Sequence, residues 1–301
     1  LVMQAKAGTK LTDVQSILRE SGQQLAFDPP DYGPLLGSGA GEGTLGGLFS
    51  CNLSGPARLK AGSARDHLLG VKGFTGRAQT FQTGSRVMKN VTGYDLCKLV
   101  AGSYGTLTIA TSLTFKVLPQ PEKTRTVLLY DVSLEKAQPI MNRAISSVHD
   151  IAAAAYLPAD IARLSPLGYI RDPEKSVLAL KIEGPGPSAE FRCNAVREML
   201  AKDGEQEELH DMNSEAFWEF VGNISPFVGT AGTLWKLSIP PANAAKLITI
   251  IEGKVPDMRY FLDWAGGLVW VQIPEDSADG GESLVRGAIN GAGHATLIRG
   301  S

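Results

Sequence analysis

The segment "GTLGGLFSCNLSGP", residues 43–56, surrounds a short apolar run with four glycines, an asparagine and a closing proline. Glycine in an ordered segment costs backbone entropy, so a glycine cluster indicates tight turns or a close approach of the backbone to another group. The stretch that leads into this segment and overlaps its start, residues 28–47, has no hydrophobic period and is rich in Pro and Gly. Long irregular stretches inside a compact domain are uncommon unless they are functional. Residues 28–56 are therefore the first candidate for a binding site.

The segments on either side of this region argue against a Rossmann-type dinucleotide-binding motif. Gly41–Gly46 formally matches G-x-G-x-x-G, and Asp66 follows near the spacing of a ribose-binding acid. That motif needs a strand before it and a long helix after it. The stretch "DPPDYGPLL" cannot form such a strand, and the apolar run ends at "SGP". The sequence also has no P-loop motif, and its four histidines lack the spacing of a metal site.

The composition is that of an ordinary globular protein of 301 residues. Apolar residues make up 43%, charged residues 20%, and the formal net charge is −2. This balance argues against nucleic acid or an anionic membrane surface as the main partner. No window reaches the roughly 18 consecutive apolar residues of a membrane-spanning helix. Cys51, Cys97 and Cys193 are odd in number and widely spaced, which favours buried thiols in a reducing cytoplasm.

Two prolines in "PQPEK", residues 119–123, mark a linker between two domains, 1–120 and 121–301. Before the linker we expect a strand at 1–8, a helix at 12–22 with Thr12 as its N-cap, a hairpin at 67–84, a short helix at 94–101 and a strand that ends near 118. After it, strands alternate with single helices, including a helix at 188–204 capped by Ser188. This order predicts an α+β fold, with the second sheet covered by helices on one face.

Several segments follow the glycine-rich one in a specific order: "AGSARDHLLGV" (61–71), "MKNVTGYDLCKLVAGSYGTL" (88–107), "AGTLWKLSIP" (231–240), "DWAGGLVW" (263–270) and "GHATLIRG" (293–300). The series resembles the FAD-binding domain of the vanillyl-alcohol-oxidase type, also called PCMH-type. Over nearly the whole chain it is similar to the E-subunit family of bacterial glycolate oxidases. The resemblance implies a partial PCMH-type FAD-binding domain at 1–120 and a cap domain with an antiparallel sheet and covering helices at 121–301.

The resemblance also implies which residues contact FAD. The glycine segment would line the isoalloxazine and the ribityl–diphosphate path, since its glycines let the backbone approach and their N–H groups can form an anion-holding nest. Arg65 and Asp66 match the family's Arg-Asp pair, and the backbone around Gly70 and Val71 that follows would meet the adenine half. A second strand edge would close over the flavin. The expected cofactor-binding residues are Pro30, Gly43, Thr44, Gly46, Gly47, Asn52, Gly55, Arg65, Asp66, Gly70, Val71, Gly102, Gly105, Thr106 and Ile109.

Other residues have two interpretations each. Lys89 and Asn90 could act electrostatically on the flavin or anchor their loop to the sheet. Cys51 could form a covalent thioether with the flavin, but a small packing thiol is the favoured interpretation. His294 could remove the substrate's hydroxyl proton, although a structural histidine is favoured, and no catalytic residue is assigned. The tryptophans are favoured as core or interface rather than as a substrate cage: Trp235, Trp264 and Trp270.

By resemblance, the chain is a FAD-dependent subunit that takes part in oxidising glycolate to glyoxylate beside a second flavoprotein subunit (D) and an iron–sulfur subunit (F). It would lie in the cytoplasm, where the complex could bring it to the inner face of the membrane. Family members have an earlier FAD-binding half and a C-terminal segment, so we expect this sequence to be part of a longer polypeptide. A self-contained FAD oxidase of another hydroxy acid or alcohol and a non-catalytic scaffold remain the alternatives.

Overall fold

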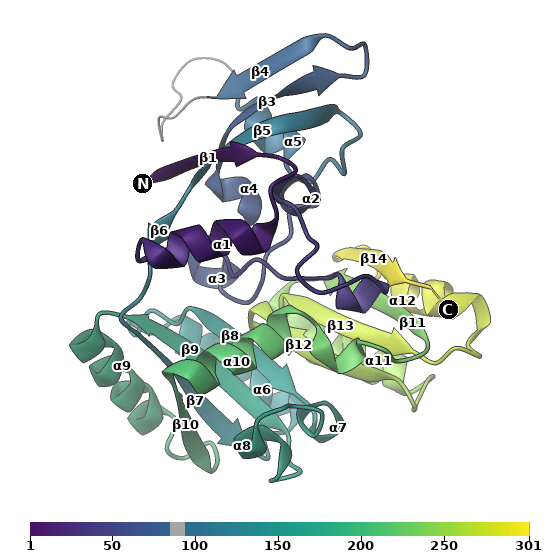
Figure 1. The fold of residues 1–301 in the computed structure, drawn as a ribbon. Coiled ribbons are helices and arrows are strands. Elements are labelled where there is room, and N and C mark those ends of the chain that lie inside the picture. Colours follow the sequence, from purple (N-terminus) through teal and green to yellow (C-terminus); the bar gives the residue numbers. More distant parts are fainter. Residues whose placement is uncertain (85–93, 301) are drawn as a thin grey trace. The chain divides into compact units, whose positions relative to one another are not determined.

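The structure is a computed structural model that describes residues 1–84 and 94–300. The chain divides into two compact units, unit 1 at Leu1–Gln120 and unit 2 at Pro121–Ser301 (Figure 1). Both units combine helices with antiparallel sheets, which confirms the predicted α+β class. Within the described residues, no helix is both long and apolar enough to cross a membrane.

Unit 1 is built on a four-stranded antiparallel sheet in the order β1-β5-β3-β4, with a small two-stranded sheet of β2 and β6. The short helices and a 3-10 turn come from the loops between these strands. The elements of unit 1 are β1 (Val2–Lys6), α1 (Leu11–Glu20), β2 (Gln23–Gln24), η1 (Pro34–Leu36), α2 (Leu45–Ser50), α3 (Arg58–Ala61), α4 (Ala64–His67), β3 (Leu68–Thr75), β4 (Thr80–Gly84), α5 (Leu96–Val100), β5 (Thr108–Lys116) and β6 (Leu118–Pro119).

The core of unit 1 lies between α1, α2 and the sheet, and it includes the buried rings of Phe27, Phe49 and Phe115. The predicted hairpin is confirmed as β3 and β4. The predicted N-cap of the first helix, Thr12, is wrong, because α1 begins at Leu11 and Thr12 therefore lies inside it. Leu11 is buried there, and starting the helix one residue earlier brings this apolar side chain into the core.

Unit 2 is built on one eight-stranded antiparallel sheet in the order β10-β7-β9-β8-β12-β13-β11-β14. Its elements are β7 (Lys123–Tyr130), α6 (Leu134–Ile145), β8 (Ala153–Leu157), α7 (Ala159–Ala162), α8 (Gly168–Arg171), β9 (Val177–Gly184), α9 (Gly186–Met199), β10 (Gln206–His210), α10 (Asp211–Gly222), η2 (Ser225–Phe227), β11 (Thr233–Ser238), η3 (Pro241–Asn243), α11 (Ala244–Glu252), β12 (Arg259–Asp263), η4 (Trp264–Gly266), β13 (Leu268–Ile273), η5 (Ala278–Gly281), α12 (Glu282–Ile289) and β14 (His294–Arg299).

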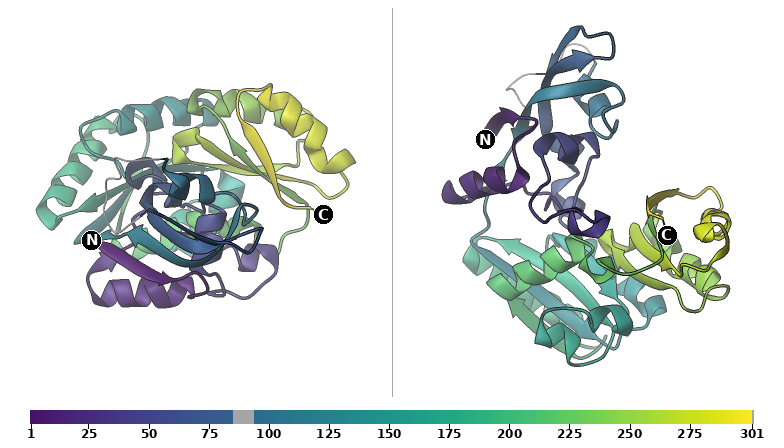
Figure 2. Two further views of the ribbon diagram at one scale, coloured as in Figure 1. Left: turned by 90° about the horizontal axis from the view of Figure 1, so that it is seen from above. Right: turned by 45° about the vertical axis from the view of Figure 1, so that its right-hand side comes forward.

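Helices cover both faces of this sheet, so the prediction of a single covered face is wrong. The helices α6, α9, α11 and α12 lie along one face and share its apolar core (Figure 2). On the other face, Ser214 and Trp218 of α10 form hydrogen bonds with Thr126 of β7, at 2.5 and 2.8 Å. Thr126 points away from the apolar core that its neighbour Val127 joins, because successive side chains of a strand alternate between faces.

Two boundaries in unit 2 differ from the sequence prediction for physical reasons. The helix expected at 188–204 is α9, Gly186–Met199, and Pro185 occupies the N-cap position that was assigned to Ser188. Proline suits this place because it lacks the N–H group that a helix start leaves unpaired. The short strand β10 was not predicted, since the charged "QEELH" lacks the apolar alternation of a typical strand.

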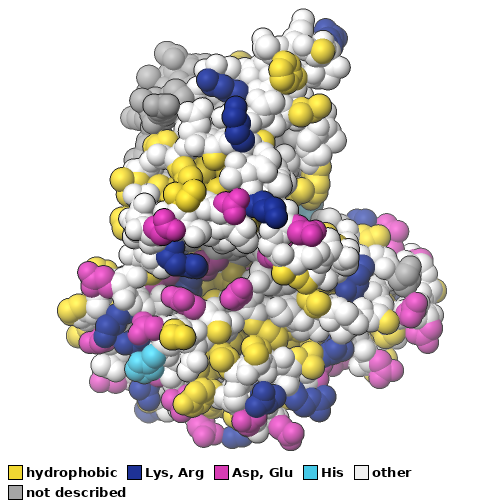
Figure 3. All heavy atoms as spheres, in the orientation of Figure 1, with side chains coloured by type: hydrophobic (Ala, Val, Ile, Leu, Met, Phe, Trp, Pro, Cys, Tyr) yellow, Lys and Arg dark blue, Asp and Glu magenta, His cyan; other side chains and the backbone are white. Residues whose placement is uncertain are grey.

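Charged side chains of both signs are interspersed on the face of the molecule that Figure 3 shows. In unit 2, several charged side chains form exposed ion pairs, such as Lys175 with Glu205 and Arg171 with Asp172. Such pairs each contribute little stability, about 0–1 kcal/mol. The mixture agrees with the small net charge of the chain.

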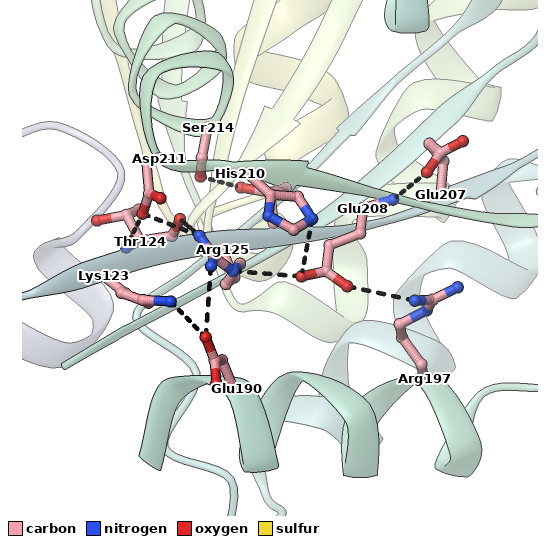
Figure 4. A network of polar contacts seen from close by, with 11 residues as sticks. Lys123, Thr124, Arg125, Glu190, Arg197, Glu207, Glu208, His210, Asp211 and Ser214 are labelled. Carbon is pink, nitrogen blue, oxygen red and sulfur yellow. Dashed lines mark hydrogen bonds and ion pairs between the residues drawn. The ribbon is translucent and has the colours of Figure 1, made fainter. Parts of the chain in front are cut away.

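Arg125 of β7 differs from these residues because its side chain is only 5% exposed. Its Nε lies 3.3 Å from Glu208 Oε1 on β10, and its Nη1 lies 2.9 Å from Asp211 Oδ1 on α10. Glu190 of α9 completes the set at 3.8 Å and also pairs with Lys123 (Figure 4). One guanidinium therefore joins β7 to three neighbouring elements.

We expect Arg125→Met to lower the free energy of unfolding by about 3 kcal/mol, since it leaves the mostly buried carboxylate of Glu208 without its buried partner. Arg197→Met is the matched control. Arg197 also pairs with Glu208, but its side chain is 40% exposed, so the expected loss is below about 1 kcal/mol. Urea unfolding of both variants measures the difference, and equal losses would contradict the importance of burial.

Asp211 should make stability depend on pH. Burial opposes its ionisation, but hydrogen bonds from Arg125 and from the Thr124 amide outweigh burial and lower the pKa of this carboxyl. A pKa that is lower in the folded state gives stability above the unfolded-state pKa, and this stability disappears as the pH falls through the folded-state pKa. We therefore expect Asp211→Asn to reduce the loss of stability below about pH 4. Unchanged acid denaturation would contradict this role.

Candidate functional site

The glycine-rich segment folds as a capped helix followed by a loop. Thr44 is the N-cap of α2, and its Oγ1 accepts a hydrogen bond from Gly47 N at 3.2 Å. The apolar run becomes the buried side of this short helix through Leu45, Leu48 and Phe49. The sequence therefore places its apolar residues in the core and leaves the glycines to shape the backbone.

Three backbone hydrogen bonds join this segment to the turn between β1 and α1. Leu11 N donates to Gly43 O at 2.8 Å, Leu45 N to Thr9 O at 3.0 Å, and Gly46 N to Ala7 O at 2.7 Å. A Cβ on Gly46 would lie 3.0 Å from that same carbonyl oxygen. Glycine at position 46 is therefore explained by the close approach of two backbone segments.

These bonds change the expected role of the glycine amides. Gly46 N and Gly47 N already donate to Ala7 O and Thr44 Oγ1. The expectation that they join Gly43 in an anion-holding nest is therefore wrong for these two amides. What these glycines can still offer to a ligand is a backbone without Cβ atoms, which the ligand can approach closely.

The expected glycines fall into two groups when a Cβ is placed on each. A Cβ on Gly55 would clash with the carbonyl of Asp28, so Gly55, like Gly46, is needed for packing. Among the described residues, Gly43 and Gly105 have no atom within 4 Å of that position, and Gly47 has only Thr44 Oγ1, at 3.6 Å. The second group leaves open surface in front of the backbone.

Asn52 joins several of the expected site residues. Its backbone is left-handed, with φ of 50°, and its Oδ1 accepts a hydrogen bond from Arg65 N at 2.8 Å. A Cβ on Gly102 would lie 3.4 Å from the Cβ of Asn52. Lys98, which the sequence did not suggest, donates to Arg65 O at 2.6 Å and to Leu68 O at 3.2 Å. Asn52, Arg65 and Gly102 are thus brought together.

Asp66 has a local structural role that the sequence did not suggest. Its Oδ2 accepts from both N and Oγ of Ser63, at 2.8 Å each, in a capping box at the start of α4. Burial opposes ionisation of this carboxyl, but the bonds from Ser63 and the charges of Lys98 and Arg58 lower its pKa. These bonds explain why an aspartate is present at position 66 without any contact to a ligand.

Gly70 and Val71 line a pocket of about 240 Å³ on the four-stranded sheet of unit 1. The other lining residues come from all four strands of this sheet: Gln4, Lys72, Gln82, Thr83, Gly84 and Thr114. The register pairs Gln4 with Thr114 and Lys72 with Gln82. The sequence carries a weak signal for this pocket, namely polar residues at paired strand positions, but only the strand order reveals that they meet.

The structure does not bring the remaining candidate residues together with Asn52 or with the pocket residues. Pro30 is buried, Thr106 Oγ1 donates to Ser103 O at 2.6 Å, and Ile109 is 69% exposed on β5. Lys89 and Asn90 lie outside the described residues.

The described surroundings of Cys51 and His294 do not support a catalytic role for either side chain. Cys51 is half-buried at the end of α2, and burial raises the pKa of its thiol, which disfavours the reactive thiolate. His294 is exposed at the start of β14 in unit 2. The described residues contain no group of three or more His, Cys, Asp or Glu that could hold a metal ion.

The chain is similar to known subunits of glycolate oxidase. It is 32% identical over 299 residues to glycolate oxidase subunit GlcE of Escherichia coli, an alignment that covers 98% of this chain and 71% of that protein. It is 31% identical over 200 residues to glycolate oxidase subunit GlcD of Bacillus subtilis, covering 63% of this chain and 40% of that protein. No protein-family model matches the chain.

Among solved structures, alkyldihydroxyacetonephosphate synthase has a similar fold, with a TM-score of 0.69 at 17% sequence identity. The similar region covers 97% of this chain and 60% of that one. The chain therefore spans less than two thirds of this structure and of the GlcD relative, and somewhat more of the GlcE relative. The identity to GlcE and the length that it covers show that the chain belongs to the family of glycolate oxidase subunit GlcE.

Proposed function

We propose that this chain is the FAD-binding subunit of a glycolate oxidase complex that oxidises glycolate to glyoxylate. The observation that carries the proposal is the open surface in front of Gly43 and Gly47, where neither packing nor a left-handed backbone requires glycine. A planar ring needs such a surface, because a Cβ would hold it away from the backbone. Membership of the GlcE family supports the same conclusion.

The residues of unit 1 fit the parts of FAD in different ways. Gly43, Thr44 and Gly47 would face the ring and the ribityl chain, with Gly102 and Gly105 on the second segment. The pocket at Gly70 and Val71 is large enough for a nucleobase and is lined by amide and hydroxyl groups that could bond to its edge. We propose that this pocket takes the adenine half. The other expected contacts are Pro30, Gly46, Asn52, Gly55, Arg65, Asp66, Thr106 and Ile109, of which Gly46, Gly55 and Asp66 would act by shaping the loops.

The chemistry divides between the cofactor and the chain. When bound, FAD supplies an acceptor for the hydride that leaves the α-carbon of glycolate, while the hydroxyl proton passes to a base. The chain's own contribution is to orient the substrate and to exclude water from it. We assign no base, and His294 stays a candidate only.

The proposed setting is a complex in the cytoplasm. A GlcD-like flavoprotein and an iron–sulfur subunit would be the partners, and membrane association would come through the complex. Similarity to both GlcE and GlcD supports a multi-subunit assembly. The three cysteines of this chain are free and separate, so the iron–sulfur centre would belong to the partner.

The first test is the visible absorbance spectrum of the purified full-length protein, with and without glycolate. We expect an oxidised-flavin spectrum that bleaches when glycolate is added to the assembled complex. Bleaching by glycolate without partners would instead favour a self-contained oxidase. A protein that carries no flavin would contradict the proposal and favour a scaffold.

Gly47→Ala should separate cofactor binding from folding. The added Cβ has room in the fold, and alanine is favoured over glycine in a helix by about 1 kcal/mol, so stability should be unchanged or higher. FAD affinity should fall at least about tenfold, or 1.4 kcal/mol, because the methyl group enters the ring's place.

Gly46→Ala is the matched control for this variant. Its Cβ would press on the carbonyl and the Cβ of Ala7, so we expect a loss of stability first and of flavin only as a consequence. Thermal unfolding and flavin content of the full-length protein measure the two effects. Full flavin retention in Gly47→Ala would contradict the assigned ring surface.

A further inference from the structure

Three segments of unit 1 carry most of the residues that we expect to contact FAD. They are the glycine segment with α2, the four-residue helix α4 that leads into β3, and the loop that follows α5. The three segments are separate in the sequence. Hydrogen bonds nevertheless connect each of them to the other two.

The end of α2 bonds to both of the other segments. Asn52 Oδ1 accepts a hydrogen bond from Arg65 N of α4 at 2.8 Å. Ser50 O accepts one from Tyr104 N, in the loop after α5, also at 2.8 Å. Tyr104 has a left-handed backbone with φ of 54°, which is unfavourable for a residue with a side chain. The fold thus accepts an unfavourable conformation where the loop meets α2.

Lys98 of α5 makes the remaining contact, between α5 and α4. Its Nζ donates to Arg65 O at 2.6 Å and to Leu68 O at 3.2 Å. A cation is stabilising at the carbonyl end of a helix. The charge of Lys98 also favours the ionised form of Asp66, which caps the start of the same helix. Because a helix of four residues is not stable alone, these contacts fix the place of α4.

The Arg65 peptide is therefore held from both sides, by Asn52 at its N–H group and by Lys98 at its carbonyl group. Leu68, the second acceptor of Lys98, is the first residue of β3. Gly70 and Val71 of the same strand line the pocket that we assign to adenine. A shift of α4 would consequently move the start of the strand that forms this pocket.

We propose that Lys98 is a positioning residue that couples the adenine end of the FAD site to its ring end and so makes the chain prefer FAD to FMN. This inference rests on the proposed function, because it assumes that the pocket takes the adenine half. FMN has the ring and the ribityl phosphate of FAD but lacks the adenosine part. The ammonium acts through the backbone of α4 and does not touch the cofactor.

The test compares FAD with FMN on the full-length protein after its flavin has been removed. We expect Lys98→Met to weaken FAD binding by about 10-fold or more, a change that lost hydrogen bonds from a charged donor can cause. FMN binding should change by less than about 3-fold, since FMN does not reach the adenine pocket. Methionine keeps the apolar part of the lysine side chain. Fluorescence titration with each flavin gives the two affinities.

Three further variants separate positioning from charge and from stability. Lys98→Arg keeps donors for both carbonyl groups and should recover most of the FAD affinity. Lys6→Met removes an exposed cation of the same unit and should leave both affinities unchanged. Leu18→Ala leaves a cavity under α1 and should lower stability without changing the ratio of FAD to FMN affinity.

Amide hydrogen exchange without any flavin tests the structural step directly. In Lys98→Met, the Arg65 amide should exchange faster, because local opening of α4 exposes it more often. Amides of β7, in unit 2, should exchange at the wild-type rate. Unchanged exchange at Arg65 would overturn the proposed positioning role.

The flavin titrations also distinguish this inference from the proposed function. Unchanged FAD affinity in Lys98→Met, or an equal loss for FAD and FMN, would overturn the coupling and leave the flavin assignment intact. A wild-type protein that binds neither flavin would contradict the proposed function and overturn this inference with it.

Discussion

Three backbone hydrogen bonds between the β1–α1 turn and the glycine segment hold the candidate cofactor site of unit 1 in place. Their geometry requires the two backbones to touch, so residue 46 must lack a side chain. The same contacts fix the start of α2, and the end of α2 leads to Asn52, which accepts the amide of Arg65. A single close approach near the N-terminus therefore determines the positions of two loops that lie far apart in the sequence.

In unit 2, the alternation of strand side chains places apolar core residues on one face of β11 and a cation on the other. Trp235 and Leu237 supply the apolar core on one face of β11, while Lys236 between them reaches the other. A left-handed turn before β13 then places an indole against that lysine. Both faces of β13 are buried, since Trp270 is only 2% exposed and stacks on Phe261 of β12.

The sequence predicts some of this structure well, and the rest depends on tertiary contacts. The β3–β4 hairpin and the α+β class follow from local patterns. The hydroxyl side chains of Thr12 and Ser188 do not mark the helix starts, because burial of Leu11 and the proline at position 185 outweigh the preference for a hydroxyl cap. At the candidate site, glycine spacing marks the correct region for study. It cannot separate Gly46, which packing requires, from Gly47, which packing does not. The pocket joins four strands, so no local pattern contains it.

Among the described residues, the eight-stranded sheet ends in two edge strands, β10 and β14, each of which pairs with a neighbour on one side. The outer side of an edge strand is a template on which another chain can form a fibre or aggregate, and charged residues at the edge are a usual protection. The sequence "QEELH" gives β10 such a protection, and Arg125 holds one of its carboxylates in place. On β14, Leu297 is half-exposed. The two ends of the sheet are therefore unequal, and strand addition from a second molecule would meet less electrostatic resistance at β14.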